Sequence, residues 1–536
     1  MTSHGRARAA ATTLVFALGG VPSSALGSGF EDFGQDLRGE PESVFGATGL
    51  FRARANALYN LDLDRGPTPS GELLFPVPQS DGTGQTLTFA DMRLRSDLSA
   101  YWPSGGAAIK VRVDALDNLV LGSAPTGIPA ASTTQDDDSG FLTIKRAYAE
   151  VLTPLGFIAF GRMGAQWGLG MLSNGGDCLD CDSGDAADRF TYILPALDHL
   201  FIGAYDFSST APTVPHQTET RAIAVEPTAM VHTVTFAVMH FTTDESRRRR
   251  RRAGRFTFDY GALATHRWQT NDIPALYLPV AGPAARPATS DDVPADQLMM
   301  RGYRATAADV WLRFVGPDVR LELEAAYLNA SVAQPSLIPG VRLRDPVTSD
   351  QFGFAFQSDF GDREDVFSAG FDAGVASGDP APGFGAYPVA GQAAPQAGDF
   401  DGPQSIPPFD NRVDNFAFHP DYRVDRILFR EIIGRITDAF YLRPHARITL
   451  AESRTGRLAA ELWGIVSGAM EPSSTPGGAR MLGVELDPSL VYTSSTGFGA
   501  SLDQATLFPL AGLDNRDLGL PARPAQLWRL RLFLEY

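Results

Sequence analysis

The sequence predicts an all-β protein, a transmembrane antiparallel β-barrel of about eighteen strands, or sixteen if one pair of segments is loop. Three observations support this fold class. Long segments alternate apolar and polar residues with period two. Short connections between these segments alternate with long ones. The last ten residues form an amphipathic strand that ends on an aromatic residue.

Composition excludes several other classes. The 536 residues include 45 Lys plus Arg and 62 Asp plus Glu, which give a net charge of −17. This acidic charge argues against a protein that binds nucleic acids without sequence preference. The 34 Phe, 14 Tyr and 6 Trp are too many for a disordered chain. A helical membrane protein would need apolar runs of about 20 residues, and the sequence has none.

The N-terminus has the pattern of a secretory signal peptide. Arg6 and Arg8 precede a short apolar stretch at 9–20, and small residues end at Ala25. The alternative is a buried N-terminal helix. We therefore expect a signal peptide over 1–25, a periplasmic lead-in over 26–49 and the barrel over 50–536.

The period-two segments are long, and each has one charged face. From Phe51 to Leu63 the odd positions are apolar, whereas Arg52, Arg54 and other polar residues occupy most even positions. A strand that spans a membrane needs about 9–11 residues, and its backbone groups must all be paired, which requires a closed barrel. The apolar face then meets lipid and the charged face lines the lumen.

The connections give the sidedness of the barrel. Short turns at 103–106, 153–156, 316–318, 361–364, 452–456 and 494–497 alternate with long loops, as in barrels with short periplasmic turns and long extracellular loops. This alternation requires a strand at 187–194, although that segment is the least regular. The predicted strands are 50–64, 87–102, 107–121, 141–152, 157–169, 187–194, 199–208, 229–242, 255–268, 303–315, 319–331, 350–360, 365–376, 436–450, 457–470, 481–493, 498–508 and 526–536.

The final strand carries the first resemblance. Its apolar face consists of Trp528, Leu530, Leu532, Leu534 and Tyr536. This pattern resembles the C-terminal signal of bacterial outer-membrane proteins, which implies recognition by the barrel-assembly machinery and a place in the outer membrane of a Gram-negative bacterium. The alternative is a plain amphipathic edge strand.

Other motifs are similar to those of porins. The segment 146–150 (RAYAE), the turn 153–156, Gly161-Arg162 and 167–170 (WGLG) resemble the early hairpins of large porins. The segment 483–487 (GVELD), Tyr492 and Phe508-Pro509 resemble the closing strands of alginate-export porins, and the layout resembles an uncharacterised myxobacterial outer-membrane group. The resemblance implies a porin-like role but not alginate as the solute.

Charged residues on the first five strands are predicted to line the lumen. They either pair with one another and stiffen a wet wall, or form a basic path for anionic solutes. Acidic residues at 322, 324, 485 and 487 suggest an opposite wall of negative charge. The predicted lumen-lining residues are Arg52, Arg54, Arg93, Arg95, Lys110, Arg112, Arg146, Arg162, Asp91, Asp114 and Glu150.

The loop 170–188 is acidic and contains both cysteines. Its carboxylates are either solvated or bind calcium, which prefers oxygen ligands, and the candidate ligands are Asp180, Asp182, Asp185 and Asp188. Cys178 and Cys181 are expected to form a local disulfide in an oxidising compartment. By its position, this loop is also a candidate to fold into the lumen and narrow it.

Two further segments stand out. Arg247 to Arg252 are six consecutive arginines in a predicted periplasmic turn, which is either simply solvated or in contact with anionic lipid or another envelope polymer. Segment 424–436 breaks the period-two pattern and predicts a short amphipathic helix that packs over or into the barrel.

We therefore expect a monomeric or trimeric porin-like channel for passive diffusion of small polar, including anionic, solutes. No cofactor is expected apart from the calcium considered above. One alternative is a non-conducting barrel whose outer loops bind a partner or surface polysaccharide; another is a soluble secreted β-protein. No enzyme is expected, because the eight His are scattered and no Gly-x-Ser-x-Gly nucleophile turn is evident.

Overall fold

A computed structural model describes residues 29–38, 44–79, 85–102, 106–121, 142–208, 213–215, 222–224, 226–272, 298–336, 341–361, 365–384, 396–400 and 410–536. The predicted signal peptide, residues 1–25, lies outside this described part. The described part includes the first residue of the first barrel strand, Phe45, and the last residue of the final barrel strand, Glu535.

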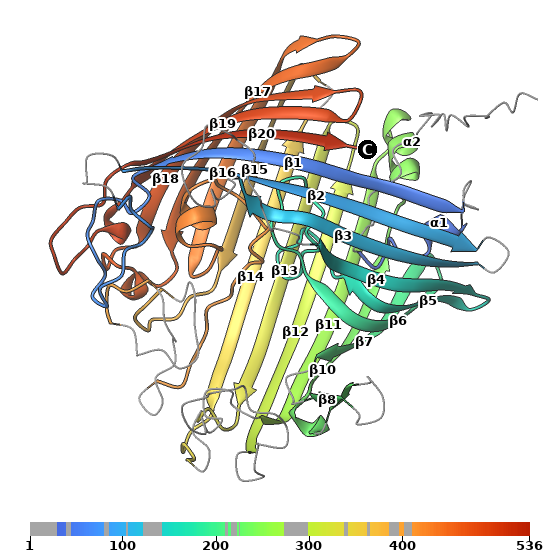
Figure 1. Cartoon of the computed structure of the whole chain (residues 1–536), viewed down its shortest axis with the longest axis horizontal. Coiled ribbons are helices and arrows are strands. Elements are labelled where there is room, and N and C mark those ends of the chain that lie inside the picture. The colour runs from blue at the N-terminus through green and yellow to red at the C-terminus, as the bar shows by residue number, and fades with distance from the viewer. Residues whose placement is uncertain are drawn as a thin grey trace, which may run out of the picture.

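Eighteen strands of the described chain form one closed antiparallel barrel. Each strand pairs with its neighbour along the chain, and the last strand pairs with the first (Figure 1). The strands are β1 (Phe45–Tyr59), β2 (Thr86–Trp102), β3 (Ala107–Val120), β4 (Leu142–Thr153), β5 (Gly156–Gly164), β6 (Ala186–Ala196), β7 (His199–Ser208), β10 (Val231–His240), β11 (Thr257–Asp272), β12 (Met299–Val315), β13 (Val319–Val332), β14 (Val347–Phe360), β15 (Phe367–Ala376), β16 (Ala439–Glu452), β17 (Gly456–Ala469), β18 (Met481–Ser494), β19 (Phe498–Pro509) and β20 (Ala525–Glu535). All eighteen predicted strands are present.

The barrel is apolar outside and polar inside, as the period-two pattern predicts. On β20, Trp528, Leu530, Leu532 and Leu534 are exposed on the outer face, and the terminal Tyr536 is also exposed. Recognition of these residues by the assembly machinery stays a prediction.

Aromatic side chains and histidines gather on the outer face near both rims. At one rim His240 stacks on Tyr260, with ring centroids 5.5 Å apart. At the other, His232 stacks on Trp268 at 5.3 Å. Such girdles mark the two interfaces of outer-membrane barrels. The chain is therefore an outer-membrane β-barrel.

No helix in the described residues is both long enough and apolar enough to cross a membrane. The helices present are short: α1 (Gln35–Arg38), α2 (Asp244–Arg252), a π-helical turn (Leu428–Ile432) and 3₁₀ turns at Pro227–Ala229, Pro472–Ser474 and Ala511–Leu513.

Several boundaries differ from the prediction. Strand β1 begins at Phe45 rather than at residue 50, and it ends at Tyr59 because Asn60, Leu63 and Asp64 adopt left-handed backbone angles (φ 57°, 61° and 51°). Strand β5 ends at Gly164, five residues before the predicted end. A two-stranded ribbon of β8 (Thr213–Pro215) and β9 (Ala222–Ala224) was not predicted.

The arginine run is a helix rather than a turn. Helix α2 has Asp244 and Glu245 in its first turn and arginines in its last turn, an order of charges that complements the helix dipole. It connects β10 and β11 at the periplasmic end, so the predicted sidedness is retained.

The lumen contains packed chain as well as polar wall. In the larger apolar cluster, Phe416, Phe418 and Ile427 pack with residues of β1 and β14 to β20. A smaller cluster joins Phe30 and Phe33 of the N-terminal segment to wall residues of β4 to β7, β10 and β12. Part of the predicted periplasmic lead-in, residues 29–38, thus packs against the barrel wall.

Candidate functional site

Two connections fold into the barrel lumen. The first lumen segment, residues 165–185, joins β5 to β6. The second lumen segment, residues 410–438, belongs to the connection between β15 and β16 and includes the π-helical turn. The prediction that the acidic loop enters the lumen agrees with this arrangement. The predicted helix within 424–436 is reduced to one turn, in which the N–H groups of Ile432 and Ile433 donate to carbonyls five residues earlier.

Arginines of β1 to β4 hold the first lumen segment by its carbonyl groups. Arg52 donates to the carbonyl oxygens of Leu179 and Cys181 at 3.1 and 3.0 Å. Arg93 donates to the carbonyl oxygens of Cys181 and Asp182 at 2.6 and 2.8 Å. Two further arginines of this wall donate to carbonyls of the same segment, Arg95 to Gly176 and Arg146 to Gly175.

Carboxylates of β12 and β13 hold the same segment by its N–H groups. Glu324 accepts from the backbone N–H groups of Met171 and Leu172 at 3.3 and 3.1 Å. Asp309 accepts from the indole Nε1 of Trp167 at 2.7 Å. The acidic wall predicted at 322 and 324 therefore lies opposite the basic wall, and the segment lies between them.

The second lumen segment is held in the same way. Glu485 of β18 accepts from the backbone N–H groups of Arg426, Ile427 and Leu428 at 2.9, 2.8 and 3.1 Å. These N–H groups come just before the π-helical turn and at its start, where backbone donors lack partners within the turn. One buried carboxylate thus satisfies three backbone donors.

The two lumen segments also bind each other. Asp421 accepts from the backbone N–H groups of Asp182 and Ser183 at 2.9 and 3.0 Å. Arg423 pairs with Asp182 at 2.7 Å, and Arg430 pairs with Asp180 at 2.6 Å. The segments therefore form one connected unit in the lumen.

Arginines control the ionisation of the two aspartates at this junction. Burial alone would raise the pKa of Asp180, but Arg430 and Arg531 outweigh it and hold that pKa well below its usual range. Burial is likewise outweighed at Asp182, whose pKa is lowered by Arg423 and Arg54.

The predicted lumen-lining residues face inward and are buried, with one exception. They form close pairs, such as Arg54 with Asp91 at 2.9 Å and Lys110 with Glu150 at 3.2 Å. This arrangement matches the paired wall rather than an open basic path. The buried members are Arg52, Arg54, Arg93, Arg95, Lys110, Arg112, Arg146, Asp91, Asp114 and Glu150.

Arg162 is the exception and corrects the prediction. It shares the outer face of β5 with the exposed Phe160, and its exposed guanidinium pairs with Asp188 of β6 at 2.7 Å. The prediction failed because β5 is short and Arg162 lies on its outer face close to the end of the strand at Gly164, where charge does not identify the lumen side.

The predicted calcium ligands do not converge. Asp180 and Asp182 bind arginines, Asp185 accepts from the hydroxyl of Ser173 at 3.3 Å, and Asp188 faces outward. No group of three His, Cys, Asp or Glu side chains suited to a metal occurs among the described residues. Asp180 and Asp182 therefore pair with arginines from distant parts of the chain, a partner that neither of the two alternatives considered for this loop included. In the same segment, Cys178 and Cys181 are joined by a disulfide.

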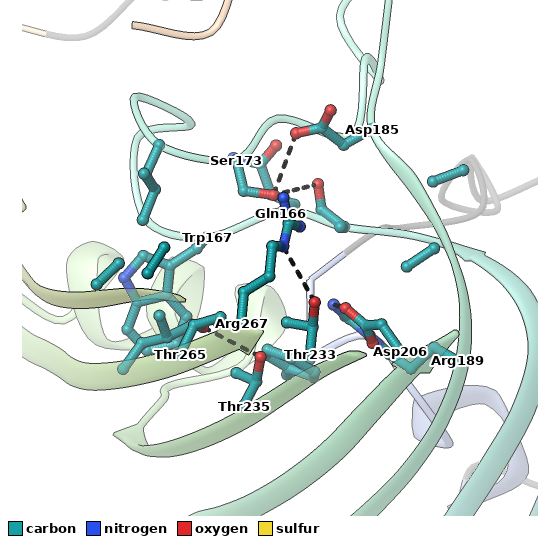
Figure 2. A pocket seen from close by; sticks show the side chains of 18 of the residues that line it. Gln166, Trp167, Ser173, Asp185, Arg189, Asp206, Thr233, Thr235, Thr265 and Arg267 are labelled. Atoms are coloured by element: carbon teal, nitrogen blue, oxygen red, sulfur yellow. Dashed lines mark hydrogen bonds and ion pairs between the residues drawn. The ribbon is translucent and has the colours of Figure 1, made fainter. Parts of the chain in front are cut away.

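A cavity with both polar and apolar lining lies beside the first lumen segment. It has a volume of about 360 Å³ and lies between that segment and the wall formed by β6, β7 and β10 to β13 (Figure 2). We call it the threonine cavity, because Thr233, Thr235 and Thr265 line it. A second cavity of about 290 Å³ lies between the two lumen segments, next to the disulfide.

Two arginines of the threonine cavity differ in their partners. Arg189 forms a two-point pair with Asp206 at 2.5 and 2.9 Å. Arg267 is exposed to the cavity and donates to the hydroxyl of Thr233 at 3.1 Å, and no carboxylate of the described chain lies within ion-pair distance of it (Figure 2). Its positive charge is therefore available to a solute.

Sequence reasoning missed these cavity residues, although a signal was present. Thr233 and Thr235 alternate with the outward-facing Phe236 and its neighbours on β10, so the period-two pattern already places them inside. Which wall borders the cavity depends on where the lumen segments lie. The period-two pattern of the strands does not encode that position.

No family model matches the sequence, and no curated protein matches it. The relationship to alginate-export porins and to the myxobacterial group therefore stays a prediction. Solved barrels are similar over most of the chain. OpdK of Pseudomonas aeruginosa, solved with vanillate, is 8% identical over 91% of this chain and 98% of that chain, with a TM-score of 0.43.

Two others are comparable. A BenF-like porin from Pseudomonas fluorescens is 9% identical over 92% of this chain and 98% of its own, with a TM-score of 0.43. OmpT, an outer membrane protein of Vibrio cholerae, is 9% identical over 92% and 97%, with a TM-score of 0.32. We transfer no residue roles from these proteins.

Replacing Arg93 should loosen the first lumen segment. Arg93→Gln removes two charge-assisted donors to its carbonyls and leaves the buried Asp114 and the partly exposed Asp117 with one partner fewer each, which we expect to cost about 3 kcal/mol. Hydrogen exchange at residues 175–183 should become at least tenfold faster. The matched control is Arg162→Gln, which removes an exposed outer pair and should leave this exchange unchanged; equal rates in both variants would contradict the assignment.

The stability contributed by the contact between the two lumen segments should depend on pH only in strong acid. The pKa of Asp182 lies below the value of about 3.9 for an unfolded chain, so its stabilisation is complete above that value and is lost only as pH falls below it. Asp182→Asn should therefore destabilise the barrel by about 3 kcal/mol equally at pH 8 and pH 5, measured by urea unfolding in lipid vesicles.

Asp188→Asn provides the comparison for this measurement. Its exposed pair with Arg162 should contribute less than about 1 kcal/mol. An Asp182→Asn effect that shrinks by half or more between pH 8 and pH 5 would show that the carboxylate titrates in the ordinary range.

Proposed function

We propose that this outer-membrane barrel is a passive, porin-like channel for small polar solutes and that solutes pass through the threonine cavity. The observation that carries the proposal is a cavity of about 360 Å³, lined in part by threonine hydroxyls and by Arg267, inside a closed barrel that also holds the two anchored lumen segments and the N-terminal segment 29–38. Solutes would move down their own gradient, with the first lumen segment setting the size limit.

The size and lining of the cavity suit small polar molecules. At about 30 Å³ per water, its volume corresponds to roughly a dozen water molecules, and it lies at the lower end of the range of small-ligand sites. Hydroxyl groups of Thr233, Thr235 and Thr265 offer donors and acceptors without a fixed charge. Such a wall replaces part of a solute's hydration shell but does not bind it tightly.

Arg267 supports a preference for anions within this proposal. The other lumen arginines of the basic wall donate to carbonyls or pair with carboxylates, so their charges are balanced locally. The guanidinium of Arg267 is exposed, and its one hydrogen-bond partner among the described residues is the hydroxyl of Thr233. A passing anion would meet this positive charge at short range.

The filled lumen favours a second candidate function. Within the barrel, Asp421 accepts from the backbone N–H of Asp182, and Arg430 pairs with Asp180, so the two lumen segments are joined to each other. A barrel filled in this way could instead serve as a scaffold whose outer loops bind a partner or surface polysaccharide.

Conductance of the purified protein in a planar bilayer distinguishes the two candidates. We expect discrete current steps, and Thr265→Phe should reduce their size by at least half because the ring would enter the cavity. The matched control is Thr306→Phe, which places the same ring on the outer face of neighbouring β12. Absence of steps from the folded wild type would favour the scaffold, and equal reduction by both variants would remove the proposed path.

Arg267→Gln should reduce anion preference. A unit charge about 5 Å from a passing ion contributes about 0.8 kcal/mol even at the dielectric constant of water. Because it stabilises an anion and destabilises a cation by this amount, the anion-to-cation permeability ratio should fall about fifteenfold in Arg267→Gln. Reversal potentials in a salt gradient measure this ratio. Arg267→Lys should retain the preference, and Arg304→Gln on the outer face should not change it; an unchanged ratio in Arg267→Gln would contradict the role of Arg267.

A further inference from the structure

Helix α2 presents a concentration of positive charge at the periplasmic end, away from the lumen site. It contains six arginines against two acidic residues, in a chain whose net charge is −17. No residue of the helix is buried. Its charge is therefore not explained by packing of the helix itself.

Some of these arginines have structural partners. Arg247 turns toward the barrel mouth, where it pairs with Asp244 at 2.6 Å and donates to the carbonyl of Thr242 at 2.7 Å. Arg251 donates to the carbonyl of Pro317 in the neighbouring turn at 2.8 Å. These two residues fasten the helix to the rim.

Other arginines have no acidic partner. We define the arginine cluster as Arg248, Arg250 and Arg252 of α2 together with Arg255, which follows the helix. All four are exposed, and none lies within ion-pair distance of a carboxylate of the described chain. No carboxylate of the described chain relieves their mutual repulsion, which favours an external anion.

The cluster adjoins the aromatic girdle of the periplasmic rim. Arg255 directly precedes Phe256, which is 63% exposed and stacks on Phe314 at 5.5 Å. The helix begins four residues after the end of β10 at His240, a length that reaches at most about 14 Å even when fully extended. The headgroup layer of a bilayer extends about 5–8 Å beyond the hydrocarbon on each side. The cluster therefore lies at or close to the level of the inner-leaflet headgroups.

We propose that the arginine cluster binds the headgroups of anionic phospholipids in the inner leaflet of the outer membrane. Guanidinium groups match the geometry of phosphate by two-point hydrogen bonds. The exposed rings of Phe256 and Phe258 beside the cluster contact acyl chains at the same position, which a soluble polyanion would not use. This lipid site is independent of solute passage through the lumen.

Native mass spectrometry of the full barrel tests the proposal. The protein is released from micelles that contain phosphatidylglycerol and phosphatidylethanolamine in equal amounts, and the bound lipids are counted. We expect the wild type to retain phosphatidylglycerol preferentially. Arg248→Gln, Arg250→Gln and Arg252→Gln combined should weaken that binding about 100-fold, since each arginine near an anionic surface contributes about fivefold.

The control keeps the net charge of the triple variant but moves the change to the extracellular end. Arg342→Gln, Arg344→Gln and Arg523→Gln combined remove three exposed arginines of long loops and should leave phosphatidylglycerol retention unchanged. Heat-modifiable migration confirms that each variant is folded. Equal retention in wild type and the α2 variant, or equal loss in both variants, would overturn the proposal. So would binding of anionic peptidoglycan fragments in place of phosphatidylglycerol with the same dependence on these arginines.

Discussion

The arrangement of the lumen depends on one constraint: irregular chain enclosed within a membrane barrel must find partners for its backbone polar groups. The barrel wall provides donors for the carbonyl groups and acceptors for the N–H groups of this chain. Arginines on β1 to β4 donate to carbonyl oxygens, and carboxylates on β13 and β18 accept from N–H groups. Each wall therefore carries the charge opposite to the partial charge of the backbone groups that it binds.

This constraint also determines where the lumen stays open. The first lumen segment binds the strongly charged wall. It therefore covers that wall, and its backbone and side-chain groups pair with the charged side chains there. Space remains on the side of β6, β7 and β10 to β13, where threonine hydroxyls and small apolar side chains line the wall. The location of the cavity is thus a consequence of the charge pattern on the opposite side of the barrel.

Much of the barrel could be predicted from local pattern. The inward position of Arg52 and the outward position of Phe51 follow from period two, and the strand at 186–196 follows from the alternation of short and long connections. The contents of the lumen could not be predicted in this way. The N–H of Asp182 finds Asp421, 239 residues later, and no local feature of either segment indicates the other. For the same reason, the local sequence suggests only water or calcium as partners of the acidic loop, whereas Asp182 pairs with arginines of β1 and of the second lumen segment.

The number of lumen arginines is therefore a poor guide to selectivity. A guanidinium that donates to carbonyls and pairs with carboxylates, as Arg93 does, presents little field to a solute because its charge is compensated at contact distance. A single exposed guanidinium with only a hydroxyl partner, as at Arg267, presents most of its charge. Selectivity in this barrel should accordingly depend on which cations the lumen segments leave uncovered, and the composition of the wall as a whole should matter much less.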